Sequence, residues 1–141
     1  MKCVSKEELI EELCEPELLK AAAGAIEPLL AERISQEVSS SSARFFLRIP
    51  RDLKFVEGHF PDLPVVPGFV QLWWSEFFAR EVKLFSGFIS KISAVKFSRP
   101  LYPGAECKLN LSWQARHSTL HFSFFDQQGV YSSGRFLVSP Q

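Results

Sequence analysis

The stretch Gly58–Trp74, which reads GHFPDLPVVPGFVQLWW, decides how this chain of 141 residues folds. Three prolines, Pro61, Pro64 and Pro67, recur at every third position. Each fixes its own φ and disfavours helical backbone in the residue before it, so this part is expected to be extended and stiff. We expect a helix to begin at Pro67, because proline fits the first helical position. After Gly68, neither proline nor glycine occurs in the next eighteen residues.

A histidine directly precedes this stiff segment. His59 is expected to lie at a fixed distance from the start of the helix, where the free N–H groups and the helix dipole favour negative charge. An imidazole with an ordinary pKa near 6.5 is largely neutral at pH 7 and can act as a general base. The pattern therefore predicts a catalytic His59 facing the Gly68 N–H. A hydrogen-bonded loop histidine and a simple helix-start glycine are the structural alternatives.

The run H-F-P-x-x-P-V-x-P-G, present in full from His59 to Gly68, resembles the signature of the 3-hydroxyacyl-acyl-carrier-protein dehydratases. The continuation Val70-Gln71-Leu72-x-Trp74 is similar to a narrower branch, the dehydratase-like proteins of aryl-polyene lipid clusters. The resemblance implies the hot-dog fold, in which a curved antiparallel sheet wraps around a long central helix.

The resemblance also implies roles for individual residues. His59 would remove the α-proton of a 3-hydroxyacyl thioester, and the Gly68 N–H would hydrogen-bond the thioester carbonyl. Family members carry a Glu or Asp fourteen residues after the histidine, whereas this chain has Trp73 there. The acid that helps to expel water is thus missing from its usual place. The substrate contacts are expected among Phe60, Pro67, Phe69 and Trp74, with a place in the core as the alternative for Trp74.

The source of the missing proton stays open at this point. Glu76 lies one helical turn beyond Trp73, yet it also precedes Arg80 by four residues, the favourable order for a surface ion pair. Glu57, two residues before His59, is a possible supporting acid or a solvated loop carboxylate. His59 alone could also carry the proton to the leaving hydroxyl.

The rest of the chain predicts an α+β fold. Residues 1–28 are expected to form a helical extension, and residues 29–141 the hot-dog domain. The helix is expected over residues 67–85, and its apolar residues cover more than one side, as in a helix enclosed by a sheet. Alternating apolar residues predict strands over 43–49, 107–114 and 119–125, and the segments 89–98 and 130–138 are also strand-like. Residues 31–38 have a mixed pattern and are also predicted to form a strand. The first two strands are expected to form a hairpin.

The charge and cysteine content of the chain argue against some classes of binding partner and cofactor. Sixteen basic and sixteen acidic residues give a net charge of zero, which argues against a general nucleic-acid or membrane surface. The three cysteines form no C-x-x-C pair, so neither a disulfide framework nor a metal site is expected. No signal-peptide core or membrane-spanning run is visible, and the cytoplasm is the expected location. Arg48, Lys96 and Arg99 are either contacts for an acidic carrier or solvated charges.

Two kinds of function follow. The first is dehydration of 3-hydroxyacyl thioesters to 2-enoyl thioesters in fatty-acid or aryl-polyene-type lipid biosynthesis. The substrate would arrive on the phosphopantetheine of an acyl carrier protein, with no other cofactor, and the resemblance implies a homodimer or a higher oligomer of dimers. The second, supported by Trp73, is a non-catalytic acyl-thioester-binding subunit paired with an active paralogue. A hot-dog thioesterase is a further alternative.

Overall fold

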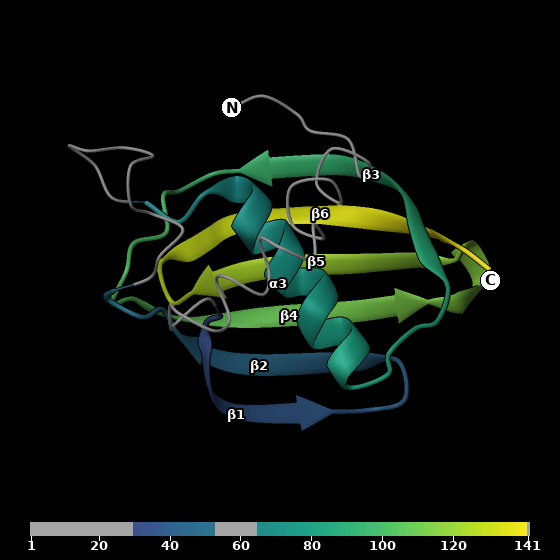
Figure 1. Ribbon diagram of the computed structural model, residues 1–141, viewed down its shortest axis with the longest axis horizontal. Helices are drawn as coiled ribbons and strands as arrows, with labels where there is room; N and C mark the ends of the chain where they lie inside the picture. The colour runs from purple at the N-terminus through teal and green to yellow at the C-terminus, as the bar shows by residue number, and fades with distance from the viewer. Residues whose placement is uncertain (1–29, 53–64, 141) are drawn as a thin grey trace, which may run out of the picture.

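A six-stranded antiparallel sheet curves around a helix in the computed structural model, which describes residues 30–52 and 65–140 (Figure 1). The strand order across the sheet is β1-β2-β4-β5-β6-β3, so the strand that follows the helix lies at one edge. The elements are β1 (Glu32–Val38), β2 (Ser42–Arg48), α3 (Gly68–Glu81), β3 (Phe88–Phe97), β4 (Glu106–Gln114), a short 3₁₀ turn (Ala115–His117), β5 (Thr119–Asp126) and β6 (Gly129–Ser139).

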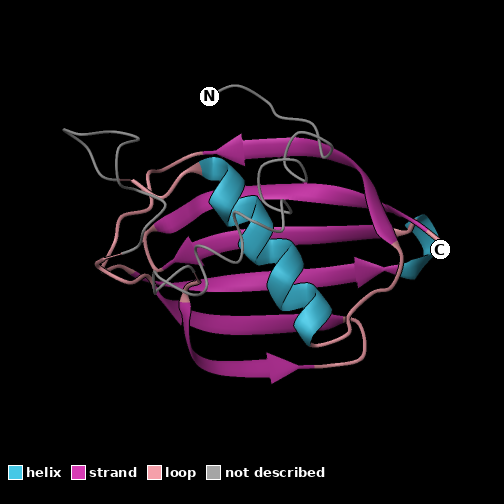
Figure 2. Cartoon of the chain, in the orientation of Figure 1, coloured by secondary structure: helices cyan, strands magenta, loops and turns pink. Residues whose placement is uncertain are grey.

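The side chains that face the helix alternate along the strands. Phe45 in β2 pairs with Leu109 in β4, and Leu109 pairs with Phe124 in β5. All three side chains are fully buried, while their neighbours along each strand are more exposed. Because strand side chains alternate between faces, this register gives the sheet one apolar face, and α3 lies across that face (Figure 2).

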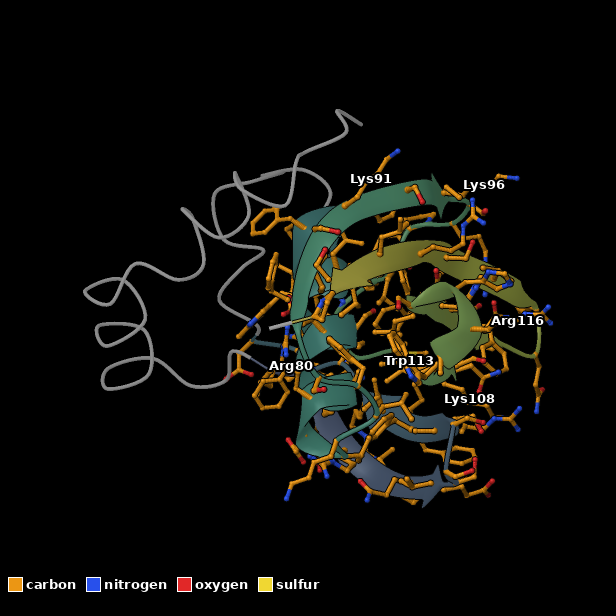
Figure 3. The ribbon with its side chains drawn as sticks, turned by 90° about the vertical axis from the view of Figure 1, so that its right-hand side faces the viewer. Arg80, Lys91, Lys96, Lys108, Trp113 and Arg116 are labelled. Carbon is orange, nitrogen blue, oxygen red and sulfur yellow. The ribbon has the colours of Figure 1, made fainter. Side chains whose placement is uncertain are left out.

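Aromatic rings join the helix to the sheet. The rings of Phe78 and Phe45 lie 4.9 Å apart, and those of Trp74 and Phe124 lie 6.5 Å apart. Burying each such side chain contributes roughly 1.5–3 kcal/mol. Seen along the sheet, the strands curl around α3, with Lys108 on the outer side and Arg80 on the helix side (Figure 3). This is the hot-dog arrangement that the sequence predicts.

The helix is shorter than the sequence indicates. It ends at Glu81 rather than at residue 85, because Lys83 adopts left-handed backbone with φ 57°. The Leu84 N–H then reaches Ala79 O at 3.0 Å, and the Lys83 N–H reaches Arg80 O at 3.0 Å. These two bonds form a Schellman cap, which normally has glycine at the left-handed position. Because lysine stands there instead of glycine, this helix end could not be predicted from local sequence.

The predicted strands are confirmed to within one residue at each end, and β1 pairs with β2 as the expected hairpin. The α+β class is likewise confirmed. The helical extension predicted for residues 1–28 lies outside the described residues. In the part of the chain that is described, no helix has the length and apolarity needed to cross a membrane.

Candidate functional site at the start of the helix

The backbone at the start of α3 sets the direction of the Gly68 N–H. Pro67 precedes the helix with φ −60° and ψ 149°, and its carbonyl accepts the N–H groups of Val70 at 3.1 Å and Gln71 at 3.3 Å. Because a trans peptide holds its N–H opposite its C=O, the Gly68 N–H points away from the helix. It is one of the donors that a helix start leaves without an internal partner, and it can therefore serve a ligand.

A cavity of about 530 Å³ opens at this point. Its wall is mainly apolar and consists of residues 65–69, Gln71 and residues 97–101. A hydrogen bond of 2.7 Å from the Val66 N–H to Leu101 O joins the two segments. An apolar cavity of this size with a few polar groups is typical of sites for small molecules and acyl chains.

The structure brings several of the predicted site residues together. Gly68, Pro67 and Phe69 all line this cavity. His59 and two other candidates from the same stretch of sequence, Glu57 and Phe60, lie outside the described residues, so their roles stay predictions. The part of the site that can be placed is thus the amide at the helix start and the apolar wall beside it.

Trp73 and Trp74 have different environments. Trp73, at the position of the family acid, is half-buried, and its ring lies 6.3 Å from that of Phe77. The indole thus occupies the position at which the resemblance implies an acid. Trp74 has no exposed surface and packs in the core. This burial agrees with the alternative place of Trp74 in the core, and its contact with substrate stays a prediction.

Glu76 forms the predicted ion pair. Its Oε2 lies 2.8 Å from Nε of Arg80, one turn further along α3. Glu76 lies eight residues after Gly68, about 12 Å along the helix axis at 1.5 Å per residue. Among the described residues that line the cavity, Glu76 is absent. The geometry therefore favours the ion pair over a role as substitute acid.

Sequence reasoning missed a polar network beside the cavity. The Gln71 side chain is 3% exposed, and its Nε2 donates to Val66 O at 3.2 Å. Its Oε1 accepts a hydrogen bond of 2.6 Å from the Ser132 hydroxyl of β6, which is fully buried. The available signal was a single amide between Val70 and Leu72, on a helix that is apolar around it.

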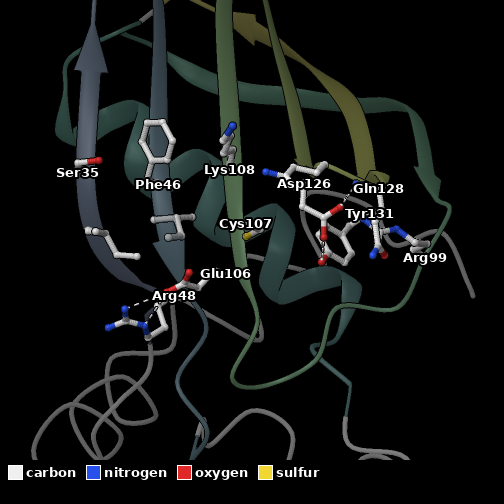
Figure 4. A pocket seen from close by; sticks show the side chains of 13 residues that line it. Ser35, Phe46, Arg48, Arg99, Glu106, Cys107, Lys108, Asp126, Gln128 and Tyr131 are labelled. Carbon is white, nitrogen blue, oxygen red and sulfur yellow. Dashed lines mark hydrogen bonds and ion pairs between the residues drawn. The ribbon is translucent and has the colours of Figure 1, made fainter.

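A second hollow, of about 610 Å³, lies over β2, β4 and the β5–β6 turn (Figure 4). Two ion pairs border it. Arg48 Nη2 lies 2.9 Å from Glu106 Oε2, and Arg99 Nη2 lies 2.5 Å from Asp126 Oδ1. Both arginines are thus paired within the chain, and the Arg48 side chain stays half exposed to solvent. Their contact with an acidic carrier stays a prediction.

The Asp126 carboxylate is the centre of the second ion pair. It accepts hydrogen bonds from the Tyr131 hydroxyl, the Gln128 N–H and Arg99. These contacts, that of Tyr131 first, lower the pKa of Asp126 to about 2. Burial and then the nearby carboxylate raise the pKa of Tyr131 to about 12. The arginine also stacks 3.9 Å above the tyrosine ring. Arg99 Nε is buried without a hydrogen-bond partner, while Nη2 of the same side chain pairs with Asp126.

Cys107 forms the floor of this second hollow. It is 5% exposed, and burial is the main cause that raises the pKa of its thiol to about 12. A thiol that stays protonated is a poor nucleophile. The second hollow therefore lacks the reactive groups expected of a catalytic centre, and the cavity at the start of α3 is the better candidate.

The fold and the site define a class of protein: a hot-dog domain in which the amide at a helix start faces an apolar cavity. Comparison with known proteins gives the family. The family described as ApeI-like, ApeI dehydratase, matches residues 35–135, and the chain belongs to it.

Individual relatives agree with this assignment. The chain is 29% identical over 96 residues to a protein named 3-hydroxyacyl-[acyl-carrier-protein] dehydratase FabZ from Nitratidesulfovibrio vulgaris, covering 58% of this chain. The match spans about three fifths, 59%, of that relative's length.

Solved structures are similar as well. The dehydratase heterocomplex ApeI:P from Xenorhabdus doucetiae has a chain that matches with a TM-score of 0.71 and 29% identity, covering 77% of this chain and 96% of that one. An uncharacterized protein from Erwinia carotovora subsp. atroseptica matches with a TM-score of 0.65 and 25% identity, over 79% and 97% of the two chains.

Proposed function

We propose that this protein dehydrates 3-hydroxyacyl thioesters, carried on an acyl carrier protein, to 2-enoyl thioesters. The observation that carries the proposal is the apolar cavity lined by Gly68, the first residue of α3, in a chain of a dehydratase family. The reaction is proposed to take place in the cytoplasm and to serve fatty-acid or aryl-polyene-type lipid biosynthesis.

The proposed reaction is an elimination. His59 takes the proton from the α-carbon, and negative charge develops on the thioester oxygen. The Gly68 N–H hydrogen-bonds that oxygen, and the apolar wall strengthens the bond because little water competes for it. The enolate electrons then form the α,β double bond while the 3-hydroxyl accepts a proton and leaves as water. His59 itself or Glu57 is the proposed source of that proton, since Glu76 is paired with Arg80.

The cavity wall suits the acyl part of such a substrate. Phe69 and Phe97 contribute aromatic surface to it, and Pro67 lines it directly before the first turn of the helix. Apolar walls bind an acyl chain without forming bonds that change during the reaction. The hydrogen bond from the amide at the helix start, in contrast, becomes stronger as negative charge develops on the thioester oxygen. An interaction that is stronger in the transition state than with the bound substrate raises the rate.

The test is conversion of a purified 3-hydroxyacyl-carrier protein, followed by intact-protein mass spectrometry. We expect loss of one water from the acyl group with wild-type protein. His59→Ala should lower the rate by about 100-fold or more, as expected for loss of a general base. His117→Ala is the matched control, because His117 is exposed in the turn before β5. It should keep the wild-type rate.

Other products would point elsewhere. Release of free acid and unloaded carrier would indicate a thioesterase. Absence of the 2-enoyl product under all conditions would refute the proposal for the protein acting alone.

A second candidate function has its own support. A similar solved structure is titled a dehydratase heterocomplex, and Trp73 replaces the family acid in this chain. Under this proposal, the protein contributes an acyl-binding site to a pair with a second dehydratase-like chain that supplies the acid. Wild-type protein would then be inactive alone and active when mixed with that chain, and the activity of the mixture would still depend on Gly68 and its surroundings.

A further inference from the structure

Gln71 connects three parts of the molecule that meet at the start of α3. Its side chain bonds to Val66 O in the segment before the helix and to the Ser132 hydroxyl in β6. Its backbone N–H also reaches Pro67 O at 3.3 Å. Gln71 thus hydrogen-bonds to both Val66 and Pro67, the two residues before the helix, and its contact with Ser132 links them to the sheet.

Burial makes these hydrogen bonds matter. Gln71 is 3% exposed and Ser132 is fully buried, so water cannot replace a lost partner. A buried polar group without a partner costs about 1–3 kcal/mol. The amide therefore has a strong preference for this arrangement, in which Nε2 donates on one side and Oε1 accepts on the other.

Both polar groups of Val66 are engaged as a result. Its N–H donates to Leu101 O at 2.7 Å, and its carbonyl accepts from the Gln71 side chain. Pro67 follows with its ring-fixed φ, and the next peptide carries the Gly68 N–H. With the residue before Pro67 held at both ends, little freedom remains in the direction of that N–H.

We infer that Gln71 is a positioning residue, which keeps the Gly68 N–H aimed at the thioester carbonyl through its bonds to Val66 and Ser132. The inference rests on the proposed function, because it takes the carbonyl as the group that the amide meets. Gln71 does not touch the reacting atoms in this scheme. Small errors in the placement of a hydrogen-bond donor lower the rate of a reaction strongly.

Three variants separate positioning from general packing. Gln71→Met keeps the length of the side chain and removes both of its hydrogen bonds. Ser132→Ala removes only the bond to Oε1. Ser75→Ala is the matched control: Ser75 is as buried as Ser132, but its hydroxyl bonds to the backbone carbonyl of Gln71 at 2.9 Å and does not reach Val66.

The kinetic expectation is a fall in kcat with KM nearly unchanged. Gln71→Met should lower kcat by about 10- to 100-fold, less than or equal to the loss expected when an oxyanion donor is removed. Ser132→Ala should lower it by a smaller factor, and Ser75→Ala should leave it at the wild-type value. KM should change little, since the apolar wall still binds the acyl chain.

A spectroscopic measurement tests the same point without turnover. Saturated butyryl-carrier protein, labelled with ¹³C at the thioester carbonyl, has no 3-hydroxyl to lose. Its carbonyl infrared band should move to lower wavenumber on binding to wild-type protein and to Ser75→Ala. In Gln71→Met and Ser132→Ala, the band should move back toward its position in free carrier.

The outcomes distinguish this inference from the proposed function. Active wild-type protein with unchanged kcat and an unchanged band in Ser132→Ala and Gln71→Met would overturn the role of Gln71 and leave dehydration intact. If wild-type protein shows the shifted band but no dehydration, and the variants lose the shift, the role of Gln71 stands and the proposed reaction fails. Ser132→Ala decides the matter if Gln71→Met does not fold.

Discussion

Arg80 engages the carboxylate of Glu76 at 2.8 Å on the exposed side of α3. The two residues are four apart, with the acid first, which is the order that stabilises a helix surface. The carboxylate oxygen that would face a leaving hydroxyl is thus already engaged by Arg80.

Glu76→Gln should therefore keep kcat within about twofold of the wild-type value. It should lower the free energy of unfolding only slightly, because a surface pair four residues apart on a helix contributes about 0.3–0.5 kcal/mol. Steady-state dehydration assays and urea unfolding give the two numbers. Arg80→Gln is the matched control and should show the same small loss of stability. A tenfold fall in kcat for Glu76→Gln alone would make Glu76 the proton donor after all.

Trp73 offers a test of whether the family's acid position still faces the reacting atoms. Trp73→Glu places a carboxyl group there, and we expect kcat to rise by about tenfold or more, since a positioned acid contributes at least that much. Trp73→Phe keeps an aromatic side chain and should stay at the wild-type rate. A rate for Trp73→Glu no higher than that of Trp73→Phe would show that the site no longer uses this position.

The Asp126 cluster predicts how stability depends on pH. The pKa of this carboxyl is lowered to about 2 in the folded protein, first by the Tyr131 hydroxyl, against about 3.9 in an unfolded chain. The resulting stabilisation is complete above about pH 4 and is lost as the pH falls through 2. Urea unfolding between pH 5 and pH 2 should thus show a smaller pH dependence for Asp126→Asn than for wild type. Equal slopes would contradict the assignment.

Lys83 predicts an easy gain in stability. Its left-handed backbone, φ 57°, strains any residue with a Cβ, and the helix cap requires that conformation. Lys83→Gly should raise the free energy of unfolding by about 0.5–1 kcal/mol after the entropy of glycine in the unfolded chain is counted. Lys83→Ala removes the same side chain and keeps the strain, so it should show no such gain. Equal effects of the two substitutions would mean that the side chain, not the backbone, matters.

The strands with one buried face were predicted well, because the alternation of apolar and polar residues along such a strand follows the alternation of buried and exposed side chains. Phe45 and Leu47 alternate with more exposed residues in β2, and the strand lies where that alternation occurs. The helix start was predictable from Pro67 for the same reason of local geometry. The C-terminal end of the helix was not predictable, because Lys83 takes the left-handed position of the cap, where glycine is the usual signal.

Contacts between distant residues could not be predicted. Arg99 and Asp126 are 27 residues apart, and Gln71 and Ser132 are 61 apart. Each pair depends on β6 lying between β5 and β3, a pairing order that the spacing of the strands does not determine. The hydrogen bonds of Gln71 at the start of α3 could therefore be recognised only once the strand order of the sheet was known.

Arg99 borders both hollows of the molecule, the cavity at the start of α3 and the one over the β5–β6 turn. A laboratory evolution campaign that replaces Arg99 to admit bulkier acyl groups would also leave Asp126 and Tyr131 without their cation. Second-round mutations should then accumulate at those two positions, although neither lines the cavity under selection. Substrate range and acid tolerance would change together.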